Sequence, residues 1–231
     1  MMNNLEKSLP ENESAKERLI NLDELAKKME SDSFRKSEVL GAFVNLVESL
    51  KEKLPSYDTI ISDEASGRVV SLALRSVINE ARNREHNEDA KIYFLALSRH
   101  YELDEPAREF IRSRIADINK VLVVTEFIES GRSMNQFAKF LDSLEIDFDI
   151  AALSIIGERD SYPDAVRSKI FFGKEGSAIG NEFYENPQVS GVVKDFVKLP
   201  HPSVYKDIDQ ENISKVRRDV DRLADELKKV I

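Results

Sequence analysis

Two segments of the sequence combine acids, hydroxyl side chains, glycine and arginine at the end of an apolar run. The first is IISDEASGRVVSLAL, residues 60–74, and the second is VLVVTEFIESGRSM, residues 121–134. In both, the apolar run leads through acids and small residues to Ser-Gly-Arg and then to a helical pattern. Glycine lets the backbone approach a ligand closely, and successive N–H groups before a helix bind anions. We therefore expect these segments to bind phosphate groups.

The side chains around the second Ser-Gly-Arg extend this expectation. Ser130 and Ser133 offer hydroxyl donors to phosphate oxygens, and Arg132 adds positive charge. The nearby carboxylates, Glu126 and Glu129, do not suit a bare phosphate, but they suit sugar hydroxyls or a phosphate-bound Mg²⁺. A ligand that carries phosphate, ribose and pyrophosphate would use all of these groups.

The two segments lie in a chain that alternates short apolar runs with helical patterns. Strands are expected at residues 59–62, 91–97, 121–124 and 148–156, with amphipathic helices between them. This order predicts an α/β fold with a parallel sheet and helices on both faces. Ligands of such sheets bind outside the carboxyl ends of the strands, which is where both Ser-Gly-Arg segments fall.

Composition and periodicity divide the whole chain into four parts. Residues 1–14 are polar and predict a disordered lead-in, and residues 15–55 predict an N-terminal helical hairpin. Residues 56–206 form the predicted α/β domain, and residues 207–231 predict an amphipathic C-terminal helix. The apolar positions of that helix recur by threes and fours. Packing on its own domain is favoured, and a homodimer seam stays open as an alternative.

The second segment resembles the signature of the type I phosphoribosyltransferase family. That signature is an apolar strand, two acids, an apolar pair, an acid or threonine, and Thr-Gly-x-Thr. Residues 121–124 match the strand, Glu126 matches the second acid, and residues 127–128 match the apolar pair. Residues 129–133 match the phosphate loop with serine for threonine, whereas Thr125 stands where the pattern has its first acid.

The resemblance covers roughly residues 56–156 and implies a phosphoribosyltransferase-like fold and activity. The protein would bind phosphoribosyl pyrophosphate (PRPP) and transfer its ribosyl 5-phosphate to a base or another nucleophile. Mg²⁺ would be bound mainly through PRPP. Glu126 would hold the ribose hydroxyls, and Glu129 would act as the catalytic residue that handles the proton of the base. The 5′-phosphate would be wrapped by Ser130, Gly131, Arg132 and Ser133.

The first segment is similar to the pyrophosphate loop of the same family. By this resemblance, pyrophosphate would contact Ala65, Ser66, Gly67 and Arg68, with Arg68 as its charge partner. Residues 157–206 would form a hood that selects the base, and Ser98–Glu105 would be the loop that closes the site. No metal site built from protein side chains is expected, because the three histidines, His86, His100 and His201, lack metal-ligand spacing.

Three alternatives remain open beside this interpretation. A tight turn between a strand and a helix, with Ser133 as a plain N-cap, would produce the same Ser-Gly-Arg-Ser. A protein of the same fold could sense PRPP or a nucleotide without catalysis and regulate a partner. The third alternative is an unrelated α/β protein-interaction module.

Charge and composition narrow the classes of partner. The 231 residues include 34 Lys and Arg and 43 Asp and Glu, which gives a net charge of −9. An acidic chain is disfavoured as a binder of nucleic acid or of anionic membranes. The absence of cysteine excludes disulfides and a cysteine nucleophile. Since no secretory signal or membrane-length apolar run is visible, we expect a cytoplasmic protein.

Overall fold

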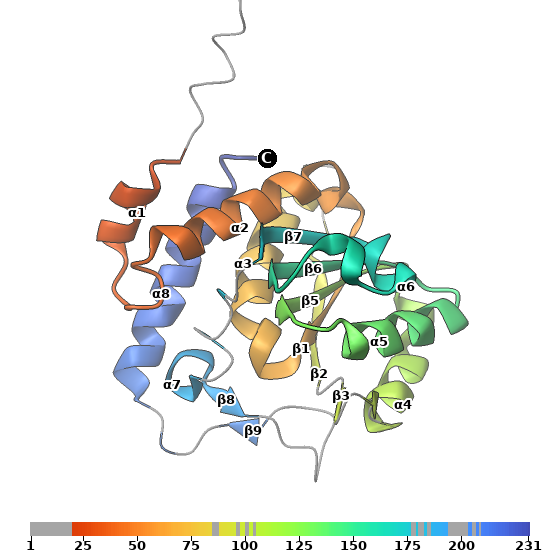
Figure 1. The fold of residues 1–231 in the computed structure, drawn as a ribbon. Coiled ribbons are helices and arrows are strands. Elements are labelled where there is room, and N and C mark those ends of the chain that lie inside the picture. Colours follow the sequence, from red (N-terminus) through yellow and green to blue (C-terminus); the bar gives the residue numbers. More distant parts are fainter. Residues whose placement is uncertain are drawn as a thin grey trace, which may run out of the picture.

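Five strands pair side by side, all in parallel, in the computed structural model of the protein (Figure 1). Their order across the sheet is β2-β1-β5-β6-β7. They span Thr59–Asp63 (β1), Lys91–Leu95 (β2), Lys120–Ile128 (β5), Asp147–Ile155 (β6) and Ile170–Glu175 (β7). The structure describes residues 20–84, 88–95, 98, 99, 102, 103, 105–176, 179, 183, 186–193, 203, 204, 207 and 209–231.

Helices precede, connect and follow these strands. The α-helices are α1 (Leu22–Lys28), α2 (Ser37–Leu50), α3 (Glu64–Asn83), α4 (Glu105–Arg114), α5 (Arg132–Ser143), α6 (Asp164–Arg167), α7 (Pro187–Ser190) and α8 (Gln210–Leu227). Short 3-10 turns cover Lys51–Ser56, Ile115–Asp117 and Arg159–Ser161. Two small antiparallel ladders pair β3 (Ser98–Arg99) with β4 (Glu102–Leu103), and β8 (Val192–Val193) with β9 (Ser203–Val204).

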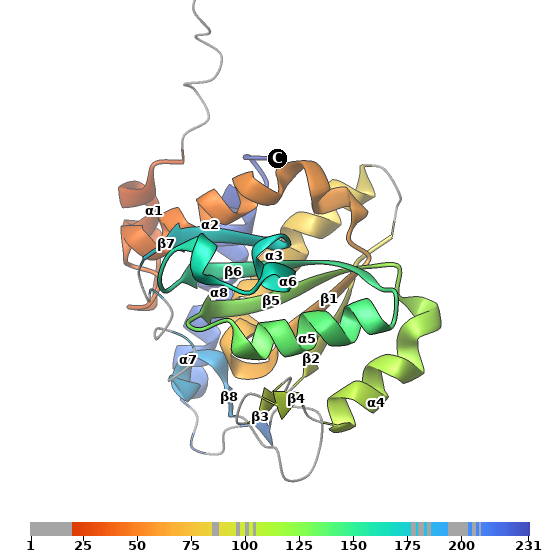
Figure 2. The ribbon, with the colours of Figure 1, turned by 45° about the vertical axis from the view of Figure 1, so that its right-hand side comes forward.

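The sheet separates two hydrophobic clusters, one on each face. Helices α1, α2, α3 and α8 contribute to the first cluster, and α4, α5 and α6 contribute to the second (Figures 1 and 2). Strand β1 is buried along its whole length because helices cover both of its faces. The predicted α/β fold with an all-parallel, doubly covered sheet is therefore confirmed.

Two local expectations differ from the structure. A turn was expected over residues 63–68. Instead, α3 begins at Glu64, so five of these six residues are helical and only Asp63 precedes the helix. The strand expected at 121–124 continues to Ile128, so Thr125 and Glu126 lie within β5. The strand is longer than expected because it pairs with β6 as far as Ile128, whose partner is Ile155.

Some sequence expectations lie outside the described residues. They include the lead-in at 1–14, the start of the first helix, and all three histidines. The expected closing loop at 98–105 is described only in part, where β3 and β4 pair as a hairpin. The apolar seam of α8 packs on the chain's own core through residues such as Val216, Leu223 and Leu227, as favoured from the sequence.

Helix α8 is attached to the N-terminal helices by a buried carboxylate. The side chain of Asp219 is fully buried and accepts hydrogen bonds from the backbone N–H groups of Glu30 and Ser31 at 2.8 and 2.7 Å. It also accepts from the Ser31 hydroxyl at 2.7 Å and from the Arg222 guanidinium at 3.1 Å. Because these donors come from the segment between α1 and α2 and from α8 itself, the contact joins both ends of the chain.

We predict that Asp219→Asn destabilises the protein by about 2 to 4 kcal/mol, because an amide nitrogen would then face buried donors. Urea unfolding would measure the loss. Asp225→Asn is the matched control, since Asp225 lies on the same helix and pairs with Lys228 at the surface. Equal unfolding midpoints for the two variants would contradict the role assigned to Asp219.

Acid should weaken the neighbouring ion pair. Arg218 donates to the Glu30 carboxylate and, with help from Arg222, lowers the pKa of Glu30 from 4.5 to about 2, against the opposing effect of burial. A lowered folded-state pKa contributes stability above the unfolded value, and that stability is lost as the pH falls. We therefore expect Glu30→Gln to reduce the acid sensitivity of unfolding between pH 4.5 and about 2. Glu109→Gln, on the exposed side of α4, should leave this dependence unchanged.

Candidate functional site

The two Ser-Gly-Arg segments follow the carboxyl ends of two neighbouring strands, β1 and β5. From β1 the chain crosses through α3 to β2 on one side, whereas β5 lies on the other side of β1. Helix α3 covers one face of the sheet and α5, which follows β5, covers the opposite face. Such a change of direction opens a crevice between the carboxyl ends of the two strands. Here those strands are β1 and β5, and each is followed by one of the two segments.

The first segment is packed tightly into this edge. A Cβ atom on Gly67 would lie 2.3 Å from the Val124 carbonyl oxygen, so only glycine allows α3 to approach β5 this closely. The Ser66 hydroxyl lies 3.1 Å from the Thr125 hydroxyl, and one of them donates to the other. Ala65, Ser66 and Gly67 are all buried in the first turn of α3. In this structure the three residues pack α3 against the sheet, and their assignment to pyrophosphate stays a prediction.

The side chain of Arg68, in the same turn of α3, extends toward strand β2. Its guanidinium carbon lies 4.3 Å from the centre of the Phe94 ring on β2. Burial lowers the pKa of Arg68, and the positive charge of Arg217 lowers it further. Among the described residues, Arg68 contacts the Phe94 ring and forms no ion pair with an acidic side chain.

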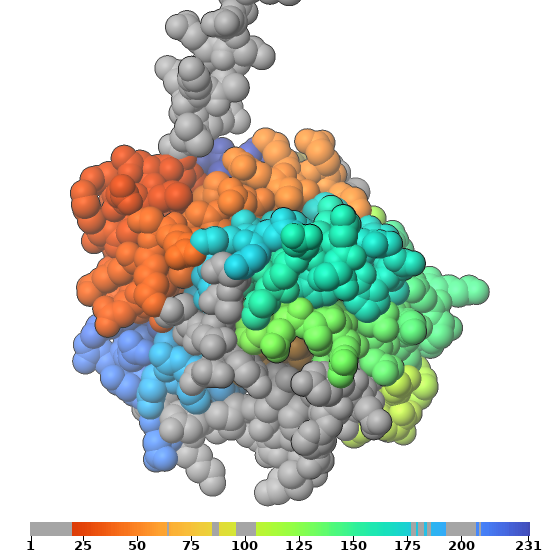
Figure 3. All heavy atoms as spheres, in the orientation of Figure 1, coloured from red at the N-terminus to blue at the C-terminus, as the bar shows by residue number. Residues whose placement is uncertain are grey.

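The second segment presents the start of α5 to the surface. Glu129, Ser130 and Arg132 are exposed, and Figure 3 shows the green residues after β5 on the surface beside the teal residues of the α6 region. Gly131 is the N-cap of α5 and adopts the left-handed conformation with φ of 69°. Since glycine has no side chain, no side chain caps this helix. The plain N-cap role for Ser133 is not observed, because Ser133 is the second residue of the helix.

An uncapped helix start has a definite chemical capacity. The first N–H groups of α5 have no carbonyl partner within the helix, and the helix dipole places partial positive charge there. Helix α5 has 12 residues, long enough for this field to develop. The Ser130 and Ser133 hydroxyls and the Arg132 guanidinium flank the same turn. The arrangement can accept a phosphate group.

Tyr162 packs against the turn before α5 and stabilises it. The sequence did not reveal this role. The Tyr162 ring packs against Gly131, where a Cβ atom would lie 2.7 Å from the ring carbon Cδ1. Its hydroxyl lies 2.8 Å from the Ile128 carbonyl oxygen and 2.6 Å from the Ile156 carbonyl oxygen, so its single proton is shared between two acceptors. Burial raises the pKa of Tyr162, which keeps it protonated as a donor.

The expected ribose-binding carboxylate is covered. Glu126 is fully buried, and its Oε1 accepts a hydrogen bond from the Phe183 N–H at 2.8 Å. The Phe183 ring packs near Phe34 and Phe43, with ring centres 5.4 and 6.4 Å away. A sugar hydroxyl can therefore reach Glu126 only if the segment at residue 183 moves aside.

Further polar side chains lie buried along the same edge. Ser71 donates to the Gly67 carbonyl oxygen at 2.7 Å and lies 3.0 Å from the Ser62 hydroxyl. On β6, the fully buried Ser154 hydroxyl has no hydrogen-bond partner among the described residues. Serine within the apolar runs of β1 and β6 is the signal that could have identified this polar edge. Buried polar groups that converge on a sheet edge are typical of ligand sites.

Two wider properties of the described residues bear on the site. They contain no group of three or more His, Cys, Asp or Glu side chains placed to hold a metal ion. None of their helices combines the length and apolar character needed to cross a bilayer.

No family model matches the chain, and no curated protein matches its sequence.

We predict that Gly131→Ala destabilises the protein more than Gly176→Ala does. Both glycines have positive φ, at 69° and 73°, but a Cβ atom on Gly176 would meet nothing within 4 Å. The conformation alone should cost about 1 to 2 kcal/mol at either site. Contact with the anchored Tyr162 ring should add about 1 kcal/mol or more at position 131. Equal losses in thermal or urea unfolding would show that Tyr162 does not support the turn.

Proposed function

We propose that the protein binds PRPP at the carboxyl edge between β1 and β5 and transfers its ribosyl 5-phosphate to a base or another nucleophile. One observation carries this proposal. The uncapped start of α5, flanked by Ser130, Arg132 and Ser133, lies at the point where the direction of the strand connections reverses. A phosphate there would receive backbone N–H bonds, hydroxyl bonds and a guanidinium charge together.

The other parts of PRPP would follow from this anchor. With the 5′-phosphate at residues 130–133, the ribose would extend toward Thr125 and Glu126 on β5. Glu126 would take the ribose hydroxyls after the Phe183 N–H releases its carboxylate. The pyrophosphate would lie toward the end of β1, near Asp63 and the start of α3. Mg²⁺ would arrive with the pyrophosphate and would screen its charge from the carboxylates of the edge.

The reaction would exchange one bond at the anomeric carbon. The bond to pyrophosphate oxygen breaks, a bond to the nucleophile forms, and the nucleophile gives up one proton. Glu129 is exposed at the end of β5 and would accept that proton. The protein would contribute mainly by holding both phosphate groups and by sheltering the cationic transition state.

A second candidate function is binding of PRPP or a nucleotide without catalysis. Two residues of β5, Thr125 and Glu126, favour it. Thr125 supplies no charge where the family pattern has an acid, and Glu126 is already engaged by the Phe183 N–H. In that case the ligand would move the segment at Phe183 and so signal to a partner. Release of pyrophosphate separates the two candidates.

We predict that calorimetric titration with PRPP and Mg²⁺ detects binding, and that Arg132→Gln weakens it by about tenfold or more, the typical effect of losing a charge-assisted hydrogen bond. Arg84→Gln is the matched control, because it removes the same charge. Arg84 is the C-cap of α3, at the end of that helix remote from β1. A pyrophosphate assay over a set of bases then tests transfer.

Two results would count against the proposal. Failure of the unmodified protein to bind PRPP would remove the transfer reaction, and failure to bind nucleotides as well would remove the second candidate. Equal binding by Arg132→Gln and Arg84→Gln would place the ligand elsewhere. Ribose and ribose 5-phosphate should be titrated in parallel, since only the phosphorylated sugar should bind.

A further inference from the structure

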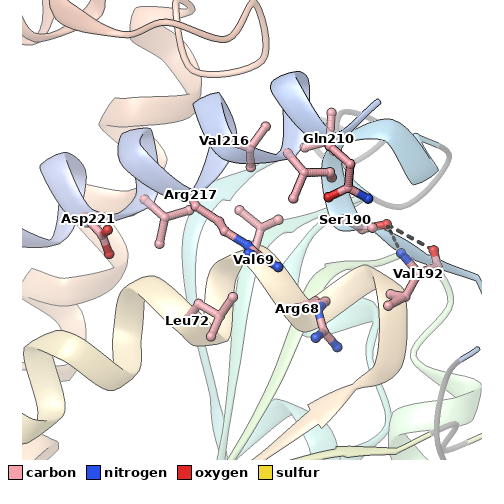
Figure 4. Close-up of a pocket in the computed structure, with 13 residues that line it drawn as sticks. Arg68, Val69, Leu72, Ser190, Val192, Gln210, Val216, Arg217 and Asp221 are labelled. Carbon is pink, nitrogen blue, oxygen red and sulfur yellow. Dashed lines mark hydrogen bonds between the residues drawn. The ribbon is translucent and has the colours of Figure 1, made fainter. Parts of the chain in front are cut away.

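A second site is walled by two helices far apart in the sequence. A cavity of about 490 Å³ lies between α3 and α8, and α7 and the start of β8 close one end (Figure 4). Its walls are largely apolar and include Val69 and Leu72 from α3 and Val216 and Val220 from α8. Small-molecule pockets typically measure roughly 300 to 1,000 Å³ and combine apolar walls with a few polar groups.

The few polar groups here include two arginines from opposite walls. Arg68 comes from the first turn of α3, and Arg217 reaches across from α8 toward it (Figure 4). Among the residues that the structure describes, neither guanidinium has a carboxylate partner in an ion pair. Asp221, one turn along α8 from Arg217, lies at the other end of the cavity (Figure 4). The cavity is therefore positive at one end.

The positive charges of Arg68 and Arg217 repel each other, and a bound anion would relieve that repulsion. Arg68 is half-buried, and both its burial and the charge of Arg217 lower its pKa. Arginine nevertheless stays charged in proteins, so the repulsion persists. An anion between the two side chains would replace repulsion by charge-assisted hydrogen bonds.

We propose that this cavity binds a small organic anion with an apolar body. Its carboxylate or phosphate lies between Arg68 and Arg217, and its apolar part packs against Val69, Leu72 and Val216. A small anion is favoured over a macromolecular polyanion, because the cavity has the volume of a small-molecule site and the chain as a whole carries a charge of −9. Arg68 is also the expected charge partner of pyrophosphate, but no residue of the α5 turn lines the cavity, so failure of 5′-phosphate binding at that turn would leave this proposal standing.

Decanoate and decyl phosphate are suitable probes, each titrated below its micelle concentration, with 1-decanol as the uncharged comparison. At least one anion should bind, and decanol should bind about tenfold more weakly or not at all. Comparing the two anions identifies the preferred acidic group. Binding of neither anion, or equal binding of decanol, would overturn the proposal.

Variants locate the binding. Arg217→Gln should weaken binding of the preferred anion by about tenfold or more. Arg218→Gln is the control, because the neighbouring guanidinium pairs with Glu30 at 2.6 Å and does not line the cavity. Leu72→Trp keeps both arginines and fills the apolar part, so it should also reduce binding. Circular dichroism confirms that each variant is folded. Equal affinity in the Arg217 and Arg218 variants would overturn the assignment to this cavity.

Discussion

Helix α3 lies so close to strand β5 that only glycine fits at position 67. A Cβ atom there would lie 2.3 Å from the Val124 carbonyl oxygen and 2.8 Å from the Ser62 hydroxyl. Because α3 begins directly after β1, this contact fixes the carboxyl ends of β1 and β5 relative to each other. It brings Ser66 against Thr125, and it leaves the opposite face free for α5 to start beside the same edge. Both Ser-Gly-Arg segments therefore follow strand ends at the same edge of the sheet, although they serve different purposes. The first glycine permits close packing, and the second permits the left-handed turn before α5.

The buried polar groups at this edge of the sheet are stabilised in part by Phe183, which lies outside the sheet. Glu126 is fully buried in a strand whose other side chains are mostly apolar, and the Phe183 N–H satisfies one of its oxygens. The Phe183 ring in turn packs with Phe34 and Phe43 beside α2. Releasing Glu126 would cost about 1 to 3 kcal/mol for the lost hydrogen bond of a buried polar group, before any change in packing. A ligand that reaches Glu126 must therefore offer hydroxyl donors in exchange. Sugar hydroxyls would meet that requirement.

The sequence predicts the sheet well because its central strands are continuous apolar runs with turn signals between them. It also predicts that the strand is broken after residue 128, since Ser-Gly-Arg-Ser favours a turn into a helix. Local pattern could not show that α3 begins at Glu64, because Gly67 looks like a turn residue until β5 is placed against it. The support of Gly131 by Tyr162 and the cover of Glu126 by Phe183 join residues about 30 and 57 positions apart. Contacts at such separations leave no local periodicity, and the pocket between Arg68 and Arg217 is of the same kind.

The central claim is that the backbone at the start of α5 binds phosphate. Amide chemical shifts of residues 130–134, followed by NMR during titration with ribose 5-phosphate, test it most directly. The account predicts that these amides shift together and saturably with the phosphorylated sugar, whereas ribose alone leaves them unchanged. Saturable shifts confined to other parts of the protein, or no shifts at all, would contradict it.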